Sequence, residues 1–107
     1  KIISNLRDIK FQTFPDKRAQ KRFRVVSSNG QILAKSAKGY DDLEDLVDVL
    51  SWITEAVRAP SVYRDKLGMF RWRCRMGNET ALVGTGSYDH HSDCTRASWR
   101  VLESVIK

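Results

Sequence analysis

Two short stretches decide the fold, Arg22-Phe23-Arg24-Val25 and Arg71-Trp72-Arg73-Cys74, which stand 49 residues apart. At nearly the same offset, Tyr40-Asp41 meets Tyr88-Asp89. Further matches along the two units pair Asn29 with Asn78, Ser36 with Thr85, Ile53 with Val101 and Glu55 with Glu103. Because the matches keep their order along two whole units, the sequence predicts two copies of one supersecondary element.

Each copy is predicted to contain two strands followed by a helix. In the first copy, Phe23 and Val25 alternate with arginines, which is the period of a half-buried strand. Asn29-Gly30 then predicts a hairpin turn, since both residues tolerate positive φ, and Asp41 or Asp42 is placed to cap a helix. The apolar positions of that helix are Leu43, Leu46, Val47, Leu50, Ile53 and Val57.

The second copy follows the same plan less regularly. Apolar residues from Phe70 to Met76 alternate with arginines, and Gly77-Asn78 or Asn78-Glu79 replaces the Asn-Gly turn. A second helix is expected to start near His90 or Ser92 and to end at Val105. We therefore predict a single domain over 1–107, with an N-terminal arm at 1–20, repeat one at 21–57, a linker at 58–69 and repeat two at 70–106. Within the arm, Ile2-Ile3 and Ile9 to Phe14 could form an extra strand or a short helix, and Val62 to Leu67 of the linker is expected to be a short crossover.

The residues of the first copy resemble those of a known family. Arg22-Phe23-Arg24, Asn29-Gly30-Gln31-Ile32, Ala34, Ser36 and Gly39-Tyr40 are similar to the repeat of the YegP-like family, small bacterial and archaeal proteins of unknown function. The second copy departs from this pattern at Cys74, at the missing Asn-Gly and at Gly84. The resemblance implies an α+β fold of tandem ββα units related by a pseudo-two-fold axis, with an antiparallel sheet and helices packed on one face. It implies no activity, cofactor or site.

Positive charge is concentrated in two segments. The chain has 107 residues and a net charge of +6. Residues 1–22 carry seven basic and two acidic residues, and 58–79 carry six and two, whereas 23–57 carry three and six. Such an uneven distribution favours contact with a polyanion.

The arginines of the two matching strands are the candidate binding residues. If Phe70, Trp72, Cys74 and Met76 face the core, the alternating arginines share the opposite face at about 6.5–7 Å intervals. The tentative nucleic-acid-binding set is Lys21, Arg22, Arg24, Arg71, Arg73 and Arg75. It could bind a phosphate backbone, or it could be a solvated face paired with acidic residues. The alternating aromatic residues should point into the core, which argues against stacking on single-stranded bases.

No catalytic or metal-binding motif is recognisable. Asp89-His90-His91 with Asp93 has no third ligand at a fixed spacing, so a polar helix start capped by Asp89 is the simpler interpretation. Cys74 and Cys94 are predicted to be buried free thiols in a reducing compartment. We recognise no signal peptide and no apolar run of about 18 residues, so we expect a cytoplasmic protein without membrane contact, enzymatic activity, cofactor or evident small-molecule substrate.

Two functions therefore remain from the sequence. The first is a small non-catalytic interaction module that binds nucleic acid through an arginine-lined sheet face. The alternative is a protein–protein interaction, inhibitor or adaptor module, or self-association, through helix faces or an exposed strand edge.

Overall fold

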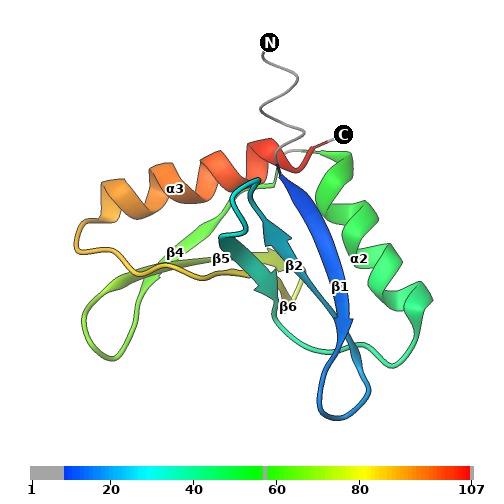
Figure 1. Ribbon diagram of the computed structural model, residues 1–107. Helices are drawn as coiled ribbons and strands as arrows, with labels where there is room; N and C mark the ends of the chain where they lie inside the picture. Colours follow the sequence, from blue (N-terminus) through cyan, green and yellow to red (C-terminus); the bar gives the residue numbers. More distant parts are fainter. Residues whose placement is uncertain (1–8, 57, 107) are drawn as a thin grey trace.

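Six antiparallel strands form one sheet in the computed structural model, which describes residues 9–56 and 58–106. The chain runs through β1 (Lys10–Pro15), β2 (Lys21–Val26), β3 (Ile32–Ser36), α2 (Leu43–Glu55), β4 (Ser61–Arg64), β5 (Phe70–Met76), β6 (Glu79–Gly84) and α3 (His91–Ser104). The strand order across the sheet is β1-β2-β3-β6-β5-β4, so β3 and β6 meet in the middle and β1 and β4 form the edges (Figure 1). The predicted α+β class with an antiparallel sheet is confirmed.

Each helix follows three strands, not two. The predicted arm at 1–20 contains β1, and the predicted linker at 58–69 contains β4. Of the strand or short helix predicted at 9–14, the structure shows the strand, whereas the crossover predicted at 62–67 was wrong because β4 lies at Ser61–Arg64. Residues 1–8 of the arm, and Val57 of the first predicted helix, lie outside the described residues.

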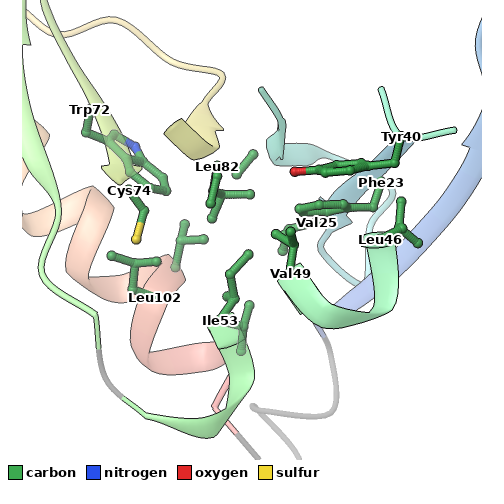
Figure 2. Close-up of a cluster of buried hydrophobic side chains, with 14 of the residues drawn as sticks. Phe23, Val25, Tyr40, Leu46, Val49, Ile53, Trp72, Cys74, Leu82 and Leu102 are labelled. Carbon is green, nitrogen blue, oxygen red and sulfur yellow. The ribbon is translucent and has the colours of Figure 1, made fainter. Parts of the chain in front are cut away.

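Both helices pack on the same face of the sheet. Phe23 and Val25 of β2, Ala34 of β3, and Trp72 and Cys74 of β5 are buried in one cluster with residues of α2 and α3. Figure 2 shows Ile53 of α2 and Leu102 of α3 on the same side as Phe23, Val25, Trp72 and Cys74. Neither described helix lies on the opposite face, which we call the open face.

The helices begin close to the predicted positions. The N-cap residue of α2 is Asp42, one of the two predicted, whereas that of α3 is His90 and not Asp89. Neither residue makes a side-chain capping hydrogen bond. In α2 the buried residues include Leu46, Val49 and Ile53. Leu43 and Val47, which we expected on the buried side, are 56% and 48% exposed, because the i, i+3, i+7 stripe through Leu46 faces the sheet.

Candidate nucleic-acid interface

One continuous row of paired residues crosses the open face. Gln12 of β1 pairs with Arg24 of β2, Arg24 with Lys35 of β3, and Lys35 with Val83 of β6. Val83 then pairs with Arg73 of β5, and Arg73 with Ser61 of β4. We call this the central row. Three of its members are cations and none is acidic. Arg22 and Arg71 lie two residues from Arg24 and Arg73 on the same strands. Because side chains alternate along a strand, all four arginines share the open face, as predicted.

Two further arginines of this face are held by carboxylates from the turns that precede their strands. Arg22 Nε lies 2.9 Å from Asp16 Oδ2, and Arg71 Nε lies 2.9 Å from Asp65 Oδ2. The other oxygen of each carboxylate accepts two backbone N–H groups of its own turn: those of Arg18 and Gln20 for Asp16, and those of Leu67 and Met69 for Asp65. Arg22 and Arg71 are therefore fixed as part of the fold.

The same hydrogen bonds lower the pKa of both carboxyl groups. For Asp16 the hydrogen bond from Arg22 is the main cause, and it outweighs the opposing effect of burial on the pKa. For Asp65 burial is the largest single effect and raises the pKa. The hydrogen bonds from Arg71 and from the Met69 and Leu67 amides together outweigh it, so the pKa is still lowered.

The edge strands bring two aromatic rings to the open face. The guanidinium carbon of Arg24 lies 4.8 Å from the centre of the Phe14 ring, and that of Arg73 lies 4.6 Å from the centre of the Tyr63 ring. Phe14 and Tyr63 pair with Arg22 and Arg71 in register, so they belong to this face. The aromatic residues that alternate with the arginines, Phe23 and Trp72, point into the core as predicted. Phe14 and Tyr63 come from the segments assigned to the arm and the linker, which that prediction did not consider.

The two arginine–aromatic pairs differ in one hydrogen bond. Arg24 Nε donates to Gln12 Oε1 at 3.0 Å. Ser61 occupies the matching place beside Arg73, and its short side chain does not accept from Arg73 Nε. Among the described residues, Arg73 Nε is the one buried side-chain nitrogen or oxygen without a hydrogen-bond partner. Because buried donors in native proteins are nearly always satisfied, this atom is an exception among the described residues.

The remaining members of the predicted set lie elsewhere or are engaged. Lys21 shares the alternation of Phe23 and Val25, and its Nζ donates to the Asp41 carbonyl at 3.3 Å. It is therefore on the helix side of the sheet, and its inclusion with the arginines was wrong. Arg75 is exposed, and its Nη2 donates to the Asn78 carbonyl at 2.9 Å in the turn to β6.

The other candidate groups have structural contacts. His91 packs edge-on against Phe70 at 5.5 Å, and Asp93 pairs with Arg96 at 3.2 Å. No cluster of three or more His, Cys, Asp or Glu residues suited to a metal ion occurs within 9–56 and 58–106.

Cys74 and Cys94 are buried and free, as predicted, and burial raises the pKa of both thiols. In the same described segments no helix is long and apolar enough to cross a bilayer.

The sequence matches no protein-family model and no curated protein. The fold is similar to that of two solution structures at 14% sequence identity. One is a UPF0339 protein from Shewanella oneidensis, with a TM-score of 0.68 over 90% of this chain and 83% of that chain. The other is YegP of E. coli, described as a protein of unknown function, with a TM-score of 0.67 over 92% and 83%. The predicted resemblance to the YegP-like fold is confirmed.

Proposed function

We propose that this protein is a non-catalytic module that binds the phosphate backbone of a nucleic acid on its open face. The observation that carries the proposal is the central row, in which Arg24, Lys35 and Arg73 lie across the sheet with no acidic residue among them. Neighbouring strands are about 4.8 Å apart, so the row sets cations over about 14 Å. A polyanion can contact several of them at once.

The distribution of charge supports this choice of face. The first turn of α2 carries Glu44 and Asp45, and Asp48 follows on the same helix. That helix packs on the side of the sheet opposite the central row. A polyanion is repelled by α2 and attracted by the open face, so it approaches in one orientation.

Salt dependence of binding tests the proposal. Affinity for a 12-nucleotide strand should fall linearly on a double-logarithmic plot as salt increases, by about 0.7 in slope for each phosphate contact. Arg24→Gln and Arg73→Gln should each weaken binding and reduce that slope. The matched control is Arg96→Gln, which removes one exposed cation from α3 and should change neither. Absence of binding at low salt, or equal effects of all three substitutions, contradicts the proposal.

We also infer that the chain arose as a tandem duplication with pseudo-two-fold symmetry, each copy being three strands and a helix. The mirrored strand order supports this, as do the two arginine–carboxylate pairs and the two arginine–aromatic pairs, which recur at an offset of 49 residues. An experimental structure tests the inference by superposition of 10–26 on 59–75 and of 32–55 on 80–103, because β3 and α2 match β6 and α3 at an offset of 48. The inference fails if the strands and helices do not coincide in this superposition.

A second candidate is a protein–protein interface along α2. The specific observation is the exposure of Leu43 and Val47, one turn apart on the helix, near β1, which is an edge strand of the sheet formed by the described residues. Light scattering across a concentration range distinguishes self-association from a monomer. If the protein self-associates through this surface, Val47→Lys should return it to a monomer. A monomer at all concentrations excludes self-association.

A further inference from the structure

The two arginine–aromatic pairs carry a more specific inference about the ligand. We infer that the open face binds single-stranded nucleic acid, with bases stacked on the two arginine–aromatic pairs. We call these pairs stations: the first is Arg24 with Phe14, and the second is Arg73 with Tyr63. The inference rests on the proposed function, because it names the class of polyanion that the same face takes. Phosphate contact alone does not require aromatic side chains. Charge therefore does not explain why an aromatic ring accompanies each of these two arginines.

The geometry of each station suits a base. In each station the guanidinium carbon lies over the ring, 4.6–4.8 Å from its centre, so a guanidinium group and an aromatic ring lie together on the open face. Bases unstacked from a single strand pack on aromatic rings and on arginine planes. In a duplex the base faces are already covered by neighbouring bases, so the planar surfaces of these side chains find no partner there.

The spacing of the stations sets the length of strand that reaches both. Arg24 and Arg73 are separated by β3 and β6, hence by about 14 Å at three strand spacings. In a helical strand the rise is about 3.4 Å per nucleotide, so about four nucleotides span the two stations at most, and fewer are needed when the bases are unstacked. Lys35 lies between them on β3 and is exposed, which places a cation beneath the intervening phosphates.

The second station is the stronger one. Arg73 Nε lacks an acceptor among the described residues, whereas Arg24 Nε is satisfied by Gln12. Arg73 Nε is buried, so a phosphate or base oxygen reaches it only if the side chain rotates. That rotation gains a hydrogen bond without breaking one. We therefore expect substitutions at Tyr63 and Arg73 to cost more affinity than those at Phe14 and Arg24.

Three ligands of equal length separate stacking from charge. They are a labelled 12-nucleotide thymidine strand, a 12-unit abasic strand with the same phosphates, and a 12-base-pair duplex. Fluorescence anisotropy at low salt should show the thymidine strand binding on the order of tenfold more tightly than the abasic strand. Tyr63→Leu should remove most of that preference, and Arg73→Lys should reduce it although the charge is kept.

Arg64 provides the matched control. Its guanidinium carbon lies 4.8 Å from the Phe70 ring centre, in a pair of the same kind on the helix side of the sheet. Arg64→Lys should leave all three affinities unchanged, and thermal melting checks that each variant is folded. Equal affinity for the thymidine and abasic strands, with salt dependence intact, overturns this inference and leaves phosphate binding standing. Tighter binding of the duplex also overturns it. Absence of binding to all three overturns the proposed function as well.

Discussion

At the scale of single residues, the two halves compensate for different core side chains. Phe23 in β2 is matched by Trp72 in β5, and both are buried. The larger indole is accommodated by Gly84, where a Cβ atom would lie 2.1 Å from Trp72 Nε1. In the first half the strand register places Ser36 in the position of Gly84, so the predicted match of Ser36 with Thr85 is wrong. Ser36 is buried beside Phe23, and its Oγ accepts a hydrogen bond from the Phe23 amide. The departure from the repeat pattern at Gly84 is thus explained by the volume of Trp72.

Gly84→Ala should lower the free energy of unfolding by about 1–3 kcal/mol, because the added methyl group collides with the indole ring. Urea denaturation measures this change. The double variant Gly84→Ala with Trp72→Phe should be less destabilised than the sum of the two single variants, since the smaller ring makes room for the methyl group. Strict additivity would contradict this account of the pair.

The two ion-paired carboxylates should make stability depend on acid pH. The pKa of Asp16 and of Asp65 is lowered in the folded state. Their contribution to stability is therefore present above the unfolded pKa of about 3.9 and is lost as the pH falls through the folded pKa. Asp65→Asn should be less stable than the parent at pH 7, and the difference should shrink on acidification.

Denaturation midpoints measured between pH 7 and pH 2 test this, with Asp93→Asn as a control for the loss of one negative charge. A constant difference between Asp65→Asn and the parent across the whole range would count against the linkage. The same substitution frees Arg71 for a phosphate, so it should also strengthen strand binding at low salt.

At the scale of elements, a residue beyond the end of α2 stabilises that end. The last turn of α2 contains no basic residue. Arg58 instead reaches back, and its Nε and Nη2 donate to the Trp52 carbonyl at 2.9 and 2.7 Å. Its guanidinium carbon also lies 4.1 Å from the centre of the Trp52 ring. One side chain therefore satisfies a terminal carbonyl and supplies positive charge at the negative end of the helix.

Arg58→Ala should reduce stability by about 1–2 kcal/mol through loss of these contacts. Arg58→Lys should recover only part of that loss, because an ammonium group cannot form the same fork over the ring. Chemical denaturation followed by circular dichroism measures both variants. Full recovery by lysine would show that charge alone stabilises the end of the helix.

The sequence predicted the elements that repeat a clear period, left β1 undecided between a strand and a short helix, and missed β4. Strands β2 and β5 and both helices were located because their apolar residues recur at steps of two or of three and four. The edge strands β1 and β4 carry mixed side chains, and their pairing with β2 and β5 is a long-range contact that no local pattern encodes. Phe14 and Tyr63 were missed for the same reason. Phe14 and Tyr63 are 49 residues apart, which is the spacing of the two arginine-rich stretches. This equal spacing was the available signal that both belong to the repeat.

At the scale of the whole molecule, the mirrored strand order has a functional consequence. Because β3 and β6 meet in the middle, the arginines of β2 and β5 lie on either side of the centre. Both helices pack on the other face, so their side chains do not interrupt the central row. The fold thus separates a helix side, where α2 is acidic, from a cationic sheet side.

A nuclear magnetic resonance titration of the full chain with a short thymidine strand tests this central claim most directly. The account predicts that the largest shifts fall on the Arg73 and Arg24 Nε–Hε signals and on the Tyr63 and Phe14 ring signals, while signals of α2 stay in place. Shifts concentrated on α2, or shifts on α3 without any on Arg73, would contradict it.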